Sequence, residues 1–448
     1  MMLTFIASMC HSFIAETVTE NRNKDNPSAI SKHAGYYSAC MLYAASLISN
    51  VVAPPLVYVL GLRFSLFLGA FFYAIYMSAF FHLTSWYLYS GAIADGLVSG
   101  LMWTAVGQYM TLNSNERTVG RNSSLMYMII MSGTLWGGVF LVVMFGSKSD
   151  RDISLSTQYI LYSVFTAVSL LGGLIFLMLP NPPEDRNEKK KLDDDQPRNH
   201  WGEVLEELYK SARLVITFDF LLIAIPSAFT GIELSFWVGV YPTSLSFTKS
   251  FSMNTNVMIA LNCISVGLGE LLGGLIFGVF GKKQTSVGRY PFMWLGTALS
   301  IVAYIAIWLN IPGPASFEET YEISVIHPNI ALALICGFLL GFFDCCINSM
   351  IYPYISVQFE GQTKQAFALS KFFHSALSAV CLFYGSVFSI QVQLSILLVG
   401  TIISSISYTY GERRYHAKQR RFILESESSG RPLAQTISSI SSDSFHKL

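Results

Sequence analysis

Apolar segments of membrane-spanning length alternate with short polar connectors along most of the chain. A helix needs roughly 20 apolar residues to cross a bilayer, and the lipid core offers backbone groups no partner, so only helices or closed barrels can cross. These segments are too long and too uniformly apolar to be the alternating strands of a barrel. The expected spans are 1–16 (short), 35–58, 64–82, 86–112, 123–146, 157–179, 215–240, 257–280, 291–310, 329–353, 365–388 and 390–410.

The spans divide the chain into two bundles of six predicted helices, a linker between them and a tail behind them. The expected parts are an N-terminal bundle at 1–179, a cytoplasmic linker at 180–214, a C-terminal bundle at 215–410 and a cytoplasmic tail at 411–448. Together they predict an all-α multi-pass membrane protein whose direct partner is the lipid bilayer.

The linker and the tail differ in their patterns. In the linker, Trp201, Val204, Leu205 and Leu208 fall at helical spacing with acidic residues opposite, which predicts a short amphipathic helix along the membrane surface. The tail is basic at first and serine-rich later, and we expect it to be disordered.

The first segment is shorter than the others. Residues 1–16 barely reach membrane-spanning length, and no basic residues precede them as they would in a signal peptide. We therefore expect a first helix that is short or truncated, with its start ahead of Met1.

Composition excludes several function classes. Charged residues make up 12% of the 448 residues, whereas a soluble domain carries about 25%. The formal net charge is zero, so no bulk field attracts nucleic acid. All seven cysteines fall within predicted helices at spacings that match no metal-binding pattern, and no P-loop or nucleophile elbow is present. We expect no disulfide framework, no metal, no cofactor and no enzymatic activity.

Basic residues in the connectors orient the chain. They concentrate on one side of the membrane, and the side rich in Lys and Arg is the cytoplasmic one. This places both termini in the cytoplasm and leaves the plasma membrane and endolysosomal membranes open. The basic side holds Arg63, Arg117, Arg121, Arg186, Lys189, Lys190, Lys191, Arg198, Lys210, Arg213, Lys282, Lys283, Arg289, Lys364 and the tail from Arg413.

Glycines at matching places suggest an internal repeat. Gly96 and Gly100 in the fourth span, and Gly337 and Gly341 in the tenth, each form a G-x-x-x-G face. Small residues at this spacing let helix backbones approach closely. These four glycines are therefore predicted helix-packing residues.

A second match supports the repeat. Gly61 closes the second span and Gly281 closes the eighth, and eleven residues before each glycine stand Asn50 and Glu270. Two matches at corresponding spans favour a duplicated six-helix unit.

A set of motifs distributed over about 1–410 resembles a known family. The motifs are Gly35-Tyr36-Tyr37-Ser38, Leu101-Met102-Trp103-Thr104-Ala105, Gly107-Gln108, Asn113-Ser114, Gly120-Arg121-Asn122-Ser123, Thr230-Gly231-Ile232-Glu233-Leu234-Ser235-Phe236, Gly267-Leu268-Gly269-Glu270-Leu271-Leu272-Gly273-Gly274, Phe338-Leu339-Leu340-Gly341 with Asp344, Ala366-Phe367-Ala368 and Lys371-Phe372. As a set they resemble the Unc-93-like family of the major facilitator superfamily, most closely the branch called major facilitator superfamily domain-containing protein eleven.

The resemblance implies a fold and a choice of functions. The implied fold is the major facilitator superfamily fold, with two pseudo-symmetric six-helix bundles. Family members include a regulator of potassium channels and a trafficking chaperone for innate immune receptors, which implies a membrane protein as partner. Two positions depart from the family pattern: Ser124 stands in place of a glycine, and Met9-Cys10 in place of a glutamine–threonine step.

Ionisable residues inside the first six spans are few. An ionisable group at the bilayer centre costs about 2.5–3.5 kcal/mol, so each needs a partner, water or a purpose. Glu16 and His82 lie near span ends and are expected to reach water. Asp95 lies nearer the middle of its span and is expected to pair with a neighbouring helix.

The last six spans are richer in such groups. Glu233, Glu270, Asp344, Lys371 and His374 are candidate central-cavity or ion-pair residues. Lys371 and His374 share a helix face, and an Asp344–Lys371 ion pair is the expected arrangement. The acids then suit a proton or substrate pathway. The alternative is that all five form a packing network.

Two functions remain open from the sequence. The first is a secondary transporter of a small solute, with protons as a candidate coupling ion. The second is a non-transporting regulator or trafficking partner of ion channels or receptors, which the family resemblance implies.

Overall fold

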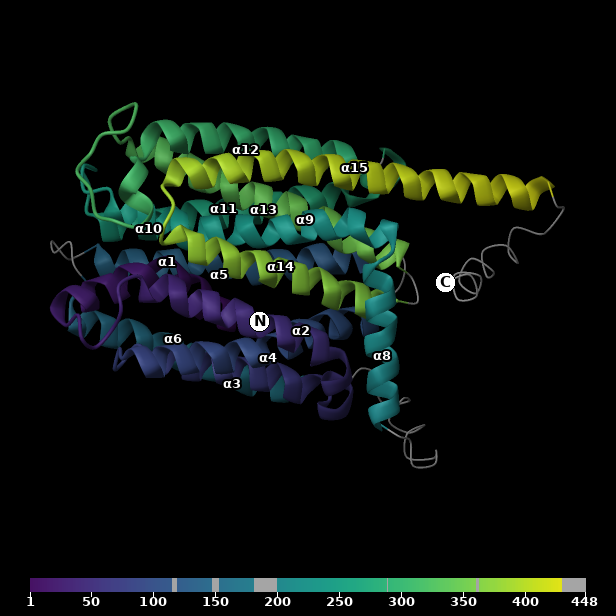
Figure 1. Cartoon of the computed structure of the whole chain (residues 1–448), viewed down its shortest axis with the longest axis horizontal. Helices are drawn as coiled ribbons and strands as arrows, with labels where there is room; N and C mark the ends of the chain where they lie inside the picture. The colour runs from purple at the N-terminus through teal and green to yellow at the C-terminus, as the bar shows by residue number, and fades with distance from the viewer. Residues whose placement is uncertain (115–118, 147–152, 181–199, 288, 360–361, 429–448) are drawn as a thin grey trace.

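Long helices run side by side along one axis of the molecule, and the shorter helix α8 lies across their ends (Figure 1). This computed structural model describes residues 1–114, 119–146, 153–180, 200–287, 289–359 and 362–428.

The helices form two groups in chain order. The first contains α1 (Met2–Asp25), α2 (Ala34–Leu60), α3 (Leu62–Ser78), α4 (Ser85–Leu112), α5 (Val119–Phe145) and α6 (Leu155–Leu177). The second contains α9 (Phe218–Ser235), the π-helix η1 (Phe236–Val240), α10 (Tyr241–Phe247), α11 (Thr255–Val287), α12 (Tyr290–Asn310), the short 3₁₀-helix η2 (Gly313–Ser316), α13 (Ile330–Gln358), α14 (Thr363–Gly385) and α15 (Ile390–Ser428).

Helix contacts repeat from one group to the other. In the first, α1 packs on α5 and α6, α2 packs on α4, and α3 packs on α4 and α6. In the second, α9 packs on α14 and α15, α11 packs on α13, and α12 packs on α13 and α15. These are the same pairings by position along each half. The predicted fold of two pseudo-symmetric six-helix bundles is therefore confirmed.

The bundles meet along two main seams. One seam joins α2 to α14, and the other joins α5 to α11. The pairing of second and fifth helices is itself two-fold related, because α2 and α11 are the second helices of their halves and α14 and α5 the fifth. We call each of these two contacts between the bundles a seam.

Apolar runs explain most of the helices. Among the described residues, ten helices are long and apolar enough to cross a bilayer, and α3 is a shorter apolar helix. The 28-residue α4 fills the remaining predicted span. All seven cysteines lie within helices, as predicted, and are free thiols in this structure.

The first helix is longer than predicted. The span expected at 1–16 is a 24-residue helix, Met2–Asp25. The predicted length was wrong because the helix continues to Asp25, past Glu16. Inside the fold this carboxylate is buried and bonded to His33 and to the backbone of Tyr36, so the helix continues without water.

The seventh span contains an irregular turn. Its α-helix changes to a π-helix at Phe236–Val240 before α10 begins. Such π segments often occur at functional sites. Here the turn follows Glu233 directly, and the indole Nε1 of Trp237 donates to Glu233 Oε2 at 3.2 Å.

The linker helix is α8 (His200–Val215), which contacts α2, α9 and α14 and lies across the bundle end (Figure 1). This position suits the helix predicted to run along the membrane surface. The rest of the linker, 181–199, falls outside the described residues.

The tail is more ordered than predicted. Residues 411–428 continue α15, which extends past the bundle on the α8 side (Figure 1), so a disordered tail from 411 onward was wrong. Arg414 Nε donates to Asp219 Oδ1 at 2.8 Å, and Lys418 also pairs with Asp219. These contacts attach the extension to the start of α9. The last part of the predicted tail, 429–448, lies outside the described residues.

Candidate functional site

A cavity of about 190 Å³ lies between the two bundles. Its wall is formed by α1 to α5 from the first bundle and by α9, η1, α13 and α14 from the second. Of the candidate site residues, Asp344, Lys371 and His374 line the cavity, whereas Glu233 and Glu270 do not. The ionisable wall groups therefore come from both bundles, because Glu16 of α1 and Asp95 of α4 face the same space.

The expected Asp344–Lys371 ion pair is not formed within the described chain. Asp344 instead accepts hydrogen bonds from the hydroxyl of Tyr127 and from Asn348 Nδ2, the latter at 3.0 Å. Tyr127 belongs to α5, so its bond crosses between the bundles. The Asp344 carboxylate is thus held by hydrogen-bond donors rather than by a lysine.

Lys371 is held by aromatic rings. Its Nζ lies 5.0 Å from the ring centroid of Trp103 and 5.5 Å from that of Tyr352. A cation over an aromatic face is attracted by the ring quadrupole. Trp103 belongs to α4, so this contact also joins the two bundles.

His374 lies one turn from Lys371 on α14. Its Nδ1 is 2.9 Å from the hydroxyl of Thr230 on α9, and its ring meets that of Tyr43 on α2 at 6.3 Å between centroids. Both α14 residues reach the cavity, as their shared helix face requires.

Glu233 and Glu270 are sealed beneath the cavity wall. Glu233 is 1% exposed and Glu270 0%, and together with Asp344 they form a carboxyl cluster within electrostatic range of one another. Among the described residues, Glu233 Oε1 and both oxygens of Glu270 have no hydrogen-bond partner. Such groups are costly in a packed interior, so they are strong candidates for a function.

Asn50 occupies on one seam the place that Glu270 occupies on the other. Its side-chain Nδ2 donates to Ser375 Oγ at 3.1 Å and to the carbonyl of Lys371 at 3.3 Å. Glu270 faces the α5 seam near Gly267, which packs against the backbone of Leu135. Repeat-equivalent polar residues thus lie on both seams.

The four packing glycines bring neighbouring backbones together. A Cβ on Gly96 would lie 2.2 Å from the carbonyl oxygen of Leu42 in α2, and one on Gly341 would lie 2.2 Å from that of Val266 in α11. Gly100 similarly faces Ser49, and Gly337 faces the side chain of Asn262. In both bundles the fourth helix therefore packs tightly on the second.

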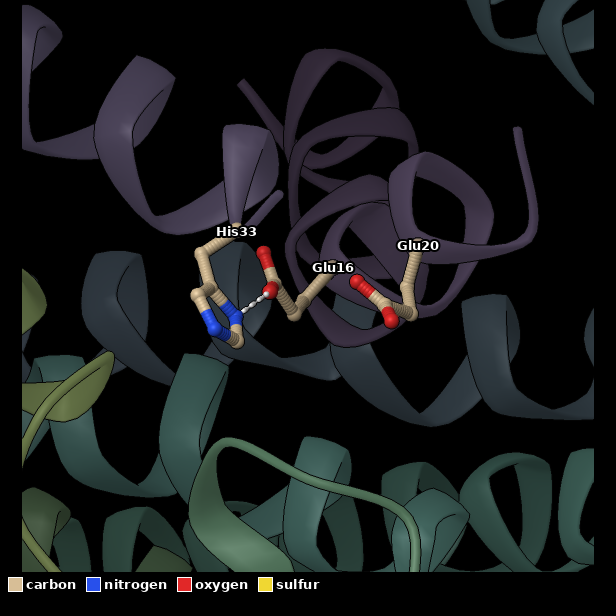
Figure 2. A group of neighbouring side chains, drawn as sticks. All are labelled: Glu16, Glu20 and His33. Atoms are coloured by element: carbon tan, nitrogen blue, oxygen red, sulfur yellow. Dashed lines mark hydrogen bonds and ion pairs between the residues drawn. The ribbon is translucent and has the colours of Figure 1, made fainter. Parts of the chain in front are cut away.

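Sequence reasoning missed a polar group on the first bundle. Glu16 was expected to reach water but is 3% exposed. Its Oε1 lies 3.0 Å from His33 Nδ1 (Figure 2), and its Oε2 accepts from the Tyr36 backbone N–H at 2.9 Å. The sequence feature that could have indicated a buried Glu16 was His33, which stands just before the Gly35-Tyr36 motif. His82 is exposed, as expected.

Glu16, Glu20 and His33 are the described group that could hold a metal ion by distance. Their ligand atoms lie within 4.8 Å of one another (Figure 2). However, Glu16 and His33 already bond to each other, whereas Glu20 Oε2 has no hydrogen-bond partner among the described residues, so we read Glu16 and His33 as a hydrogen-bonded pair beside Glu20 rather than as an open coordination site.

An ion-pair cluster joins the bundles at the end opposite α8. Glu319, in the loop between α12 and α13, binds Lys24 of α1 at 2.7 Å and Lys249 at 2.9 Å. Burial alone would raise the pKa of Glu319, but hydrogen bonds and charge from the two lysines hold it below its usual value. The hydroxyl of Tyr36 also donates to the carbonyl of Ser316 at 2.8 Å.

Two repeated bundles around a shared cavity define a protein of the major facilitator type. The fold matches that of a variant of the Escherichia coli fucose:proton symporter, with a TM-score of 0.55 and 12% identity, covering 92% of this chain and 97% of that one. At this identity the likeness concerns the fold alone.

The chain belongs to the UNC-93 family. The family model described as "Ion channel regulatory protein UNC-93" matches residues 26–409. UNC93-like protein MFSD11 of Xenopus tropicalis is 31% identical over 423 residues, 92% of this chain and 93% of the relative. Protein unc-93 homolog A of Bos taurus is 22% identical over 85% of this chain and 86% of its own length. UNC93-like protein 3 of Arabidopsis thaliana is 22% identical, covering 83% and 77%.

Proposed function

We propose that this protein is a secondary transporter that moves a small solute by rocking its two bundles around the central cavity. The observation that carries the proposal is the cavity itself, which lies midway along the helices and has a mainly apolar wall, shared by both bundles, that includes Asp95, Asp344 and Lys371. The termini face the cytoplasm in this proposal, in the plasma membrane or an endolysosomal membrane, because the basic connectors lie on that side.

Contacts at the end opposite α8 suit a gate. Lys24 and Glu319 join the first bundle to the second there, and Tyr36 contacts Ser316 nearby. If the bundles rock apart at this end, these contacts break, while the two seams act as the pivots.

The carboxyl cluster supports proton coupling. Glu233, Glu270 and Asp344 lie within electrostatic range of one another, and neighbouring carboxylates resist ionising together. A change of charge in the cavity therefore alters the electrostatic potential at Glu233 and Glu270. Proton uptake and release by this cluster would link solute binding to bundle movement.

A cross-linking experiment tests the transport proposal. Purified protein in liposomes is assayed for uptake from a mixed panel of amines, amino acids, sugars and carboxylates. In a Lys24→Cys/Glu319→Cys variant, a bifunctional thiol reagent ties the bundles together at one end, and uptake should fall more than 10-fold. The matched control is Lys249→Cys/Glu319→Cys, whose cross-link stays within the second bundle. In this control, uptake after treatment should stay within twofold of uptake by the same variant before treatment.

Unchanged uptake after the inter-bundle cross-link would contradict alternating access. Absence of uptake for every panel member in untreated protein, together with no solute-dependent rise in melting temperature, would contradict transport itself.

The second candidate function is a non-transporting regulator or trafficking partner of a channel or receptor. The family description names an ion channel regulatory protein, and the extension of α15 offers a surface, with His416, Arg420 and Arg421 exposed beyond the bundle. Recovery of a membrane protein with the full chain, but not with a chain ending at 411, would favour this function.

A further inference from the structure

Asp95 is an acidic group of the cavity wall for which the fold supplies no partner. It lies on α4, is 4% exposed and faces the cavity. Within the described chain it makes no ion pair and no hydrogen bond, so the expected pairing with a neighbouring helix is not found. Glu270 is sealed in protein, whereas Asp95 opens onto the space that a solute would occupy.

The other ionisable side chains in the described cavity wall are satisfied within the protein. This leaves Asp95 as the ionisable wall group that has no hydrogen-bond, ion-pair or ring partner among the described residues, so a group that enters the cavity can become its partner. The satisfied groups are Glu16 with His33, Asp344 with Tyr127, Lys371 with Trp103, His11 with Tyr162 and His374 with Thr230.

Three tyrosines of the cavity wall lie near Asp95. Tyr43, Tyr73 and Tyr76 line the cavity, and each lies within electrostatic range of the Asp95 carboxyl. Aromatic faces attract cations, including the ammonium groups of ligands, and a carboxylate adds a direct ion pair. The combination resembles an aromatic cage for an ammonium group more than a site for an anion or a sugar.

The protein's own cation does not fill this site. Lys371 is stacked over Trp103, which lies eight residues beyond Asp95 on the same helix, about 12 Å along its axis. The cavity of about 190 Å³ has room for about six water molecules, so the occupant is small.

We infer that the transported solute is a small organic cation, a primary amine or a quaternary ammonium, whose charged head binds at Asp95 among Tyr43, Tyr73 and Tyr76. This rests on the transporter function proposed above. Asp95 is then the residue that selects the charge of the solute, while the cluster around Asp344 lies on the opposite bundle.

Three linear probes of similar chain length and different charge test the inference: the cation n-butylammonium, the neutral n-pentanol and the anion valerate. Saturable rises in melting temperature are measured on the full-length protein in detergent. Butylammonium should stabilise the protein, and the other two should not. Asp95→Asn should weaken the apparent affinity for butylammonium at least 10-fold, and Asp95→Glu should retain it within about threefold.

The matched control is Asp219→Asn, which removes an acid at the start of α9 that does not line the cavity. Its response to butylammonium should stay within twofold of the parent protein. If Asp95→Asn does not fold, the comparison of the three probes on the parent protein and on Asp95→Glu decides the matter.

Two results would overturn the inference and leave transport standing. One is stabilisation and uptake of valerate or pentanol in preference to butylammonium. The other is an undiminished butylammonium response in Asp95→Asn. No stabilisation or uptake with any solute class would instead refute the transporter function, and the inference with it.

Discussion

The two seams between the bundles are built alike but carry different chemistry. On the α2–α14 seam, Asn50 is hydrogen-bonded to Ser375 and to the carbonyl of Lys371. On the α5–α11 seam, the repeat-equivalent Glu270 is fully buried, and neither of its oxygens has a partner within the described chain. One seam is closed by satisfied polar contacts, and the other holds an acid at a cost in stability.

This difference indicates which of the two seams is the better candidate for a role in the proposed transport. A duplicated fold has no packing reason to place an unsatisfied acid on one of two equivalent seams, since an apolar side chain would pack there at lower cost. The α5–α11 seam also lies beside Asp344, whose carboxylate accepts from Tyr127 of α5. We therefore regard the α2–α14 seam as mainly structural and the α5–α11 seam as the one altered for function.

The largest effect is expected from filling the α5–α11 seam. A Cβ on Gly267 would lie 2.5 Å from the backbone nitrogen of Leu135, so Gly267→Leu forces the bundles apart and should cost about 3 kcal/mol or more. Purified yield and melting temperature measure the loss. Gly107→Ala is the matched control, because a Cβ there meets nothing within 4 Å; equal melting temperatures for the two variants would contradict close packing at this seam.

Replacing the unsatisfied acid should have the next largest effect. Glu270→Met keeps the side-chain length and removes two unpartnered oxygens, so stability should rise by about 1–3 kcal/mol. Uptake should fall at the same time if the acid belongs to the proton pathway. Thermal melting and liposome uptake measure the two effects, and a loss of stability would show that Glu270 is part of a satisfied network.

A loss of stability, rather than a gain, is expected from replacing the polar residue on the α2–α14 seam. Asn50→Leu removes the donor to Ser375 Oγ and the Lys371 carbonyl, so stability should fall by about 1–2 kcal/mol. Ser375→Ala alone is a useful companion, because it removes one of the two acceptors and should cost less. A stabilising Asn50→Leu would erase the contrast between the seams.

The smallest effect concerns the ion pairs outside both seams. The lysines beside Glu319 lower its folded-state pKa, so its contribution to stability is present above the ordinary glutamate pKa and is lost as the pH falls through the lower folded value. The contribution should be about 0.5–1 kcal/mol, because the pair with Lys24 is partly exposed. Melting curves of the parent protein and Glu319→Gln should differ at neutral pH and converge in acid; a constant gap would assign the effect to packing.

Much of the fold could be predicted from the sequence because the bilayer imposes a simple rule on apolar length. The rule located the spans after the first, and the spacing of Gly96 and Gly337 predicted the duplicated packing of the fourth helices on the second. It failed at α1, where Glu16 is satisfied by His33 and Tyr36 instead of by water. It also missed the end of α15, where the helix continues through a strongly polar sequence.

The candidate site could be predicted less completely. Residue type alone marked Asp344, Lys371 and His374, which do line the cavity. Their partners could not be deduced, because Tyr127 and Trp103 lie on distant helices and nothing in the chain's order sets the distances across the cavity. Asp95 lines the cavity and Glu270 does not, although both are buried, and this difference depends on the assembled fold.

The extension of α15 has a practical consequence. Its 18 residues from 411 to 428 correspond to about 27 Å of continuous helix, tied near its base to Asp219. A small, rigid marker protein joined in helical register at Ser428 would be carried at a fixed orientation. It would give electron cryo-microscopy an alignment feature that a membrane protein of this size otherwise lacks.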